Sequence, residues 1–114
     1  MHRALWLIPL ALCMDGCGDT PPPEVTPALM TVAQRQWPGI TAEQLQRGRQ
    51  TLMIRCTECH GLRQPVDHLP REWAAYLLEM GPKARLDERD TTELTRYLLA
   101  AREQALAAAA ATAR

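Results

Sequence analysis

The chain has 114 residues, which is enough for one small domain. Thirteen basic residues balance thirteen acidic ones, and this argues against a nucleic-acid-binding protein, which needs a surplus of Lys and Arg on one face. Hydrophobic residues make up 46% of the chain, but many lie in the first fourteen residues or in an alanine-rich tail, so the folded part is smaller than the chain.

The N-terminus has the pattern of a secretory signal peptide. A short basic segment, residues 1–3, precedes an apolar run of about eleven residues, 4–14. This run is too short for a membrane-spanning helix, which needs about 20 apolar residues. We therefore predict export from the cytoplasm.

A small residue, Gly16, precedes Cys17, as in the lipobox of bacterial lipoproteins, where the cysteine is acylated and becomes the first residue of the mature chain. We predict that residues 1–16 are a lipoprotein-type signal peptide and that Cys17 is the lipidation site. Asp15 departs from the lipobox pattern, so ordinary cleavage nearby and an uncleaved anchor remain alternatives. Cys13 is a weaker candidate because Leu12 precedes it.

Residues 17–40 are predicted to be a proline-rich linker. The stretch 20–27 favours an extended polyproline conformation, which acts as a semi-rigid spacer of roughly 3.1 Å per residue. Such a spacer would hold a domain away from a membrane surface. A disordered N-terminus is the alternative.

Thr41 and Gln44 have the spacing of a capping box, which predicts the start of a helix that continues to about Cys56. Gly48 lies inside this helix, where a glycine costs about 1 kcal/mol relative to alanine. The usual reason for such a glycine is the close approach of another helix or a cofactor.

A second helix is predicted from about Arg71 to Met80, where Gly81-Pro82 should end it. A third is predicted to begin near Asp87 or Asp90 and to continue into the alanine tail, with residues 105–113 as a fraying extension. No alternating pattern indicates a strand.

We therefore predict an all-α domain over residues 41–100, followed by an alanine-rich helical extension over residues 101–114. A domain this small rarely supplies enough core by itself, and natural examples add a disulfide, a metal or another staple. Something besides side chains is expected to complete the core.

The pentapeptide Cys56-Thr57-Glu58-Cys59-His60 matches C-x-x-C-H, the attachment signature of c-type haem. Two thiols one helical turn apart can add to the two vinyl groups of haem, while the adjacent histidine ligates the iron. Attachment of this kind takes place outside the cytoplasm, in agreement with an export signal. One covalent haem c would then complete the core.

Three other uses of Cys56 and Cys59 remain open. A thioredoxin-like redox pair needs a βαβ pattern, which the sequence lacks. A structural zinc site would use His60 and a fourth ligand, for which His68 is the nearest candidate. A disulfide between the two cysteines would close a very small loop and leave the core unfilled.

Met80 is the best candidate for the second axial ligand, because it ends a predicted helix twenty residues after His60. A His/Met pair raises the reduction potential of haem iron. Met80 as a core filler is the alternative. His68 would give a bis-His centre, although eight residues leave little chain to cross the porphyrin. Met53 is expected to pack rather than to ligate.

These features, taken in order, resemble the class I cytochrome c family, and in particular its short bacterial members with one haem. The resemblance covers about residues 41–100 and rests on Gly48, the pentapeptide 56–60, Trp73, Met80, Leu86 and the Leu94-x-x-Tyr97-Leu98 pattern. It implies a small cytochrome c-like fold of three to four helices around one covalently bound haem. It also implies that the first and last helices cross at Gly48 and Tyr97 and that Met80 is the distal ligand.

Further roles follow from the same resemblance. The ring N–H of His60 is expected to donate to a backbone carbonyl near Pro65 or Pro70. Trp73 is expected to pack on the porphyrin, to donate to a haem propionate, or simply to fill the core. Three arginines are candidate propionate partners or solvated surface charges, namely Arg55, Arg63 and Arg71.

The sequence thus predicts a periplasmic cytochrome, tethered to a membrane through Cys17, that transfers single electrons between redox protein partners. The cofactor-binding residues are Cys56, Cys59, His60 and Met80, of which His60 and Met80 are the metal ligands. We expect a carrier without enzymatic activity and without a small-molecule substrate. A haem-based sensor of small ligands and the haem subunit of an oxidoreductase complex are the alternatives.

Overall fold

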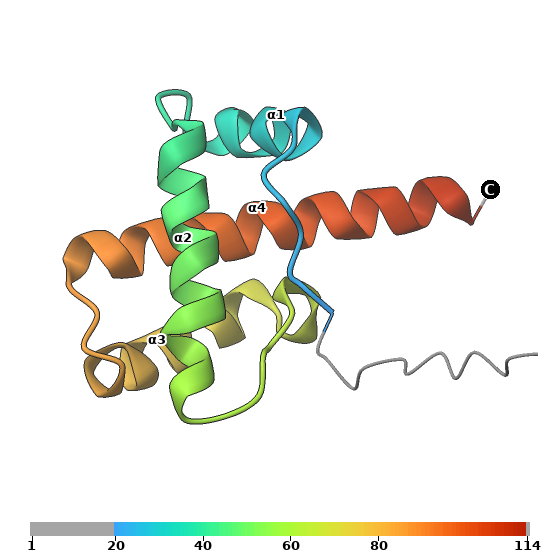
Figure 1. The fold of residues 1–114 in the computed structure, drawn as a ribbon. Helices are drawn as coiled ribbons and strands as arrows, with labels where there is room; N and C mark the ends of the chain where they lie inside the picture. Colours follow the sequence, from blue (N-terminus) through green and yellow to red (C-terminus); the bar gives the residue numbers. More distant parts are fainter. Residues whose placement is uncertain (1–19, 114) are drawn as a thin grey trace, which may run out of the picture.

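The computed structural model describes residues 20–113, and this part of the chain is helical without any strand (Figure 1). The prediction of an all-α protein is confirmed. The predicted signal peptide, Cys13 and the predicted lipidation site Cys17 lie outside the described residues. The helices are α1 (Pro27–Gln36), α2 (Ala42–Ile54), α3 (Pro70–Lys83) and α4 (Glu88–Thr112), with two 3₁₀ turns, η1 (Cys56–Glu58) and η2 (Pro65–Asp67).

Helix α2 begins at the predicted capping box. The Thr41 hydroxyl accepts a hydrogen bond from the Gln44 backbone N–H at 3.2 Å, and the Gln44 side chain accepts one from the Thr41 N–H at 3.0 Å. These two bonds satisfy backbone donors that a helix start leaves without partners. The helix ends at Ile54, and the cysteine motif, residues 56–60, follows in the turn η1 and the bend after it.

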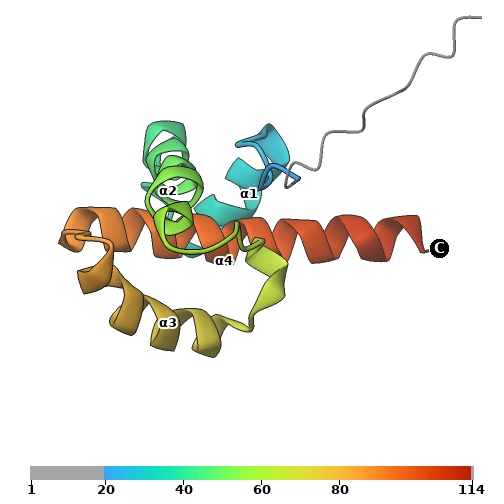
Figure 2. The same cartoon turned by 60° about the horizontal axis from the view of Figure 1, so that its bottom comes forward.

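Helices α2 and α4 cross (Figures 1 and 2). Gly48 lies at the crossing, against Glu93 and Tyr97 of α4. A Cβ atom placed on Gly48 would lie 2.3 Å from the backbone oxygen of Glu93 and 2.8 Å from Cβ of Tyr97. Only a residue without a side chain allows this approach. The expected crossing of the first and last domain helices at Gly48 and Tyr97 is therefore present.

Helix α1 corrects the prediction of a linker for the described residues 20–40. Thr26 caps it, since its hydroxyl accepts from the Leu29 N–H at 3.2 Å, and Pro27 occupies the first turn. Leu29, Val32 and Ala33 are buried in the core, where α1 packs against α4. Their spacing of three and four residues is helical, but the prolines around them had indicated an extended segment.

Residues 20–26, here called the N-terminal strap, have no regular secondary structure and are not a free spacer. Pro22 is buried, and the Arg49 guanidinium donates to the carbonyls of Pro22 and Pro23 at 3.1 to 3.2 Å. The Tyr97 hydroxyl donates to the Pro23 carbonyl at 2.5 Å. The strap is therefore fixed at the crossing of α2 and α4, so neither the free spacer nor the disordered N-terminus is correct for these residues.

Helix α3 continues three residues beyond its predicted end at Met80. The residue that ends it is Arg85, whose φ of 58° lies in the left-handed region. The Leu86 N–H donates to the Gly81 carbonyl at 3.0 Å and the Arg85 N–H to the Pro82 carbonyl at 3.1 Å, which is the Schellman pattern of helix termination. The prediction that Gly81-Pro82 ends the helix was wrong because the left-handed residue comes later.

Helix α4 begins after Asp87, whose carboxylate accepts from the Asp90 N–H at 2.7 Å, so Asp87 rather than Asp90 is the cap. Its middle supplies Leu94, Tyr97 and Leu98 to the core. Its last turns extend beyond the other helices, and residues 106–113 are exposed (Figure 1). Within residues 20–113, no helix has the length and apolar character needed to cross a membrane.

Candidate functional site

The predicted haem-binding residues line a single cavity of about 240 Å³ between the cysteine motif and the C-terminal half of α3. Cys56, Cys59 and His60 reach it from the chain that follows α2, and Met80 reaches it from α3. Leu77 adds an apolar wall. The fold thus brings together residues that are up to 24 positions apart in the sequence, as the ligand assignment requires.

Both cysteines of the motif are free thiols, so the disulfide alternative is not formed. Cys59 is exposed and Cys56 is half-buried. Burial raises the pKa of the Cys56 thiol, and the positive charge of Arg55 offsets this only in part. Cys56 therefore stays protonated at neutral pH, and two unmodified thiols face the cavity.

The His60 ring is oriented by the backbone immediately after it. Its Nδ1 atom lies 2.7 Å from the carbonyl oxygen of Gly61. Because a carbonyl only accepts hydrogen bonds, this contact places the proton of the neutral ring on Nδ1 and leaves the Nε2 lone pair for a metal. The carbonyl that orients the ring is that of Gly61 and not one near Pro65 or Pro70, so that prediction was wrong in its partner.

Trp73 fills the core and does not line this cavity. The side chain is 2% exposed, and its indole N–H donates to the Pro65 carbonyl at 2.9 Å. Among the three roles considered, core packing describes this position, since the N–H that was to reach a propionate already has a partner.

His68 lies outside the cavity, against aromatic rings of α3. Its ring centroid is 4.7 Å from that of Trp73 and 4.5 Å from that of Tyr76. Nowhere in residues 20–113 do three or more His, Cys, Asp or Glu side chains gather closely enough to hold a metal ion. The four-residue zinc site is therefore not assembled, and His68 is not placed as an iron ligand.

Met53 differs from its expectation, whereas the exposure of Arg63 and Arg71 agrees with the alternative of solvated surface charges. Met53 was expected to pack, but it is 36% exposed and does not line the cavity. Arg63 and Arg71 are also exposed and away from the cavity, whereas Arg55 lines it. The Arg55 guanidinium donates to the backbone carbonyls of Ala84 and Arg85 at the end of α3. The sequence carried no signal for this long-range contact.

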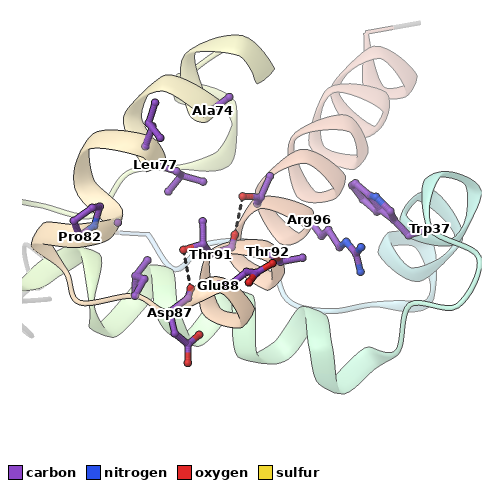
Figure 3. Close-up of a pocket in the computed structure, with 13 residues that line it drawn as sticks. Trp37, Ala74, Leu77, Pro82, Asp87, Glu88, Thr91, Thr92 and Arg96 are labelled. Carbon is purple, nitrogen blue, oxygen red and sulfur yellow. Dashed lines mark hydrogen bonds between the residues drawn. The ribbon is translucent and has the colours of Figure 1, made fainter.

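A larger hollow of about 590 Å³ lies next to the cavity, between α3 and α4 (Figure 3). Trp37 and Arg96 stand at its far side, with the Arg96 guanidinium carbon 5.6 Å from the Trp37 ring centroid. Leu77, Gly81 and Leu86 line both hollows and form the wall between them. Sequence reasoning did not predict this groove.

The adjoining hollows bear on whether the site fits a porphyrin. Ligand pockets usually have volumes of about 300–1,000 Å³, and the cavity at the cysteine motif is smaller than this. The larger groove adjoins it, because Leu77, Gly81 and Leu86 line both hollows. The donor set fits haem c: two thiols, one imidazole nitrogen and one thioether face the same space.

A comparison of the chain with protein-family models, curated proteins and solved structures finds no match. The interpretation of the site therefore depends on the identity of these residues and on their positions in the fold.

Proposed function

We propose that the protein is a monohaem c-type cytochrome that carries single electrons between redox protein partners. The observation that supports this best is the cavity itself, in which the C-x-x-C-H residues face Met80 from another helix. A motif that arises by chance would have no reason to face a thioether twenty residues away. The Gly48–Tyr97 helix crossing, which the resemblance to class I cytochromes c implied, is a second and independent support.

Each residue has a defined part in this proposal. Cys56 and Cys59 would hold the group through thioether bonds, and His60 would ligate the iron through Nε2. Met80 would supply a second ligand, whose soft sulfur would favour the reduced metal and so raise the reduction potential. Haem, when bound, supplies one iron that accepts and releases a single electron. If His60 and Met80 both ligated the iron, neither position would be free for a substrate, and this favours electron transfer over catalysis.

Electron-transfer partners would dock near the cysteine motif. Ile54, two residues before Cys56, is 61% exposed, and Met53 beside it is also exposed. Such a small apolar surface suits the weak, transient interfaces of redox proteins, which bury less than about 1,200 Å².

The location we propose is the periplasmic side of a membrane, with Cys17 as the lipid anchor. Only Gly18 and Asp19 separate Cys17 from the N-terminal strap, and the Gln64 amide holds the Thr20 carbonyl at 2.6 Å. An anchored domain would therefore lie close to the membrane. Cys17→Ser should move the protein from the membrane fraction to the soluble periplasmic fraction, and unchanged fractionation would contradict the anchor.

The decisive experiment is expression with a c-type haem maturation system, followed by optical spectra of the oxidised and dithionite-reduced protein. We expect sharp reduced bands and haem that stays attached after denaturation. Protein without haem would refute the proposal. A five-coordinate spectrum in the parent would favour the sensor, and co-purification with a dehydrogenase would favour the subunit.

The assignment of Met80 is tested by Met80→Ala. The variant should keep covalent haem but lose the thioether ligand, which lowers the reduction potential and opens one axial position. Met53→Ala is the matched control, because Met53 lies outside the cavity. Equal potentials and spectra in Met80→Ala and the parent would show that Met80 is not the ligand.

A further inference from the structure

Arg55 makes the contacts from which we draw a further inference. It is the C-terminal cap residue of α2 and stands directly before Cys56. Its Nη2 atom donates to the carbonyl of Ala84 and, at 3.3 Å, to the carbonyl of Arg85. These two carbonyls belong to the end of α3, which is the helix that carries Met80. A side chain at the start of the cysteine motif thus reaches the helix of the predicted distal ligand.

The end of α3 is a place where a cation is stabilising. The last carbonyls of a helix lack partners within it and carry the negative end of the helix dipole. Arg85 also adopts the left-handed conformation, with a φ of 58°, which is unfavourable for a residue with a side chain. The donors of Arg55 satisfy two carbonyls at this strained turn and so help to hold it.

The same contact joins the two walls of the cavity. Arg55 and Cys56 line one wall, and Met80 and Ala84 line the other. In the described part of the chain, no other hydrogen bond or ion pair links residues 42–60 with residues 70–86. The hydrogen bonds of Arg55 are therefore the polar contacts that hold the two walls of the cavity together.

We propose that Arg55 is a positioning residue that links the cysteine motif to the end of α3 and so holds Met80 in the cavity that His60 also lines. The effect on iron ligation by Met80 rests on the proposed function. The hydrogen bonds between Arg55 and the end of α3 are present in the polypeptide without haem. The role differs from that of a propionate partner, which the sequence had allowed for Arg55, because its guanidinium acts on backbone carbonyls.

The link between Arg55 and α3 can be tested without haem by amide hydrogen exchange in Arg55→Gln. The Leu86 N–H, which is bonded to the Gly81 carbonyl, reports on the end of α3. Loss of a charged donor should speed its exchange about tenfold. Arg49→Gln is the matched control, since Arg49 lies on the same helix and also donates to carbonyls, but those of the N-terminal strap. Equal exchange of Leu86 in both variants would overturn the proposal.

The consequence for Met80 is tested with the haem-loaded protein by titration with imidazole, which competes with the thioether for iron. If Arg55 holds Met80 in place, Arg55→Gln should bind imidazole about tenfold more tightly than the parent, whereas Arg49→Gln should match the parent. A reduction potential that changes with unaltered imidazole affinity would instead identify Arg55 as a propionate partner and overturn the positioning role.

Arg55→Lys guards against a variant that fails to fold or to load haem. Both carbonyls are reached by the single Nη2 atom of Arg55. Lysine keeps the charge but ends one bond earlier, so it should give an intermediate exchange rate at Leu86 and an intermediate imidazole affinity. Values for Arg55→Lys identical to those of the parent in both measurements would contradict the proposal. If the parent carries no haem, the proposed function fails while the exchange experiment still tests the link between Arg55 and α3.

Discussion

Tyr97 connects three parts of the chain at a single residue. Its ring is fully buried at the crossing of α2 and α4, and its hydroxyl donates to the Pro23 carbonyl of the N-terminal strap. Burial raises the pKa of the phenol well above its usual value of 10, and the charge of Arg49 counteracts this only in part. The hydroxyl therefore stays protonated in the folded protein and acts as a permanent donor.

Replacing Tyr97 by Phe removes this donor and leaves the Pro23 carbonyl without it. We expect the free energy of unfolding at pH 7 to fall by about 1 kcal/mol. In the parent, the unfolded chain ionises near pH 10 while the folded chain does not, so stability is complete below pH 10 and decreases as the pH rises above it. The stability of Tyr97→Phe should therefore decrease less between pH 10 and pH 12 than that of the parent. Urea unfolding at pH 7 to 12 measures this difference.

The control for this experiment is Tyr76→Phe, because the Tyr76 ring is 38% exposed on α3. It should keep the pH dependence of the parent. An unchanged slope in Tyr97→Phe would mean that the buried phenol does not contribute to the alkaline loss of stability.

At the scale of residues, the sequence predicted contacts that depend on a contiguous motif or on a position in a helix. The motif residues 56–60 are contiguous, and Met80 follows at a helix position, so their meeting in one cavity could be anticipated. The carbonyl partners of Arg55 lie 29 and 30 residues away at a turn with no sequence signature, because the left-handed residue there is Arg85 rather than glycine. Contacts of this kind depend on the tertiary fold.

At the scale of elements, the crossing of α2 and α4 depends on Gly48. Alanine is the better helix former by about 1 kcal/mol, so local propensity alone would favour Gly48→Ala. The new Cβ would, however, meet the Glu93 backbone oxygen at 2.3 Å, and backbone cannot move as a flexible side chain does. We therefore expect a net loss of about 1–3 kcal/mol or more in unfolding free energy, measured by urea denaturation.

Gly39→Ala is the matched control, because a Cβ there would have no heavy atom within 4 Å and its φ is not positive. Its stability should equal or slightly exceed that of the parent, since alanine restricts the unfolded chain. A Gly48→Ala variant as stable as Gly39→Ala would contradict the close approach of the two helices.

Helix starts were more predictable than helix ends. Thr41 and Asp87 cap their helices with bonds to residues three positions on, so the signal is contained in four residues. Helix α1 was missed because Pro27 and the prolines before it suggested extended chain, although proline suits the first turn of a helix. What decided the conformation of α1 was the apolar face that α4 offers to Leu29 and Val32, which only the tertiary fold supplies.

At the scale of the whole molecule, the two ends of the chain contribute differently. Helix α1 and the N-terminal strap cover α4 and lock its crossing with α2, whereas the last turns of α4 extend into solvent (Figure 1). The part that stabilises the fold therefore includes residues 20–40, which the sequence had placed before the domain boundary at residue 41.

Two truncations test this difference between the ends. A protein that starts at Thr41 instead of Thr20 loses the burial of Leu29 and Val32, and each such side chain contributes about 1.5–3 kcal/mol. Its free energy of unfolding should fall by about 3 kcal/mol or more, because the exposed face of α4 then meets water. Removal of residues 106–113, which are exposed, should change stability by no more than about 0.5 kcal/mol. The free energy of unfolding of both truncated proteins is measured by urea denaturation and compared with that of a protein covering residues 20–113. If the proteins starting at Thr20 and at Thr41 were equally stable, residues 20–40 would be a linker, as the sequence had predicted.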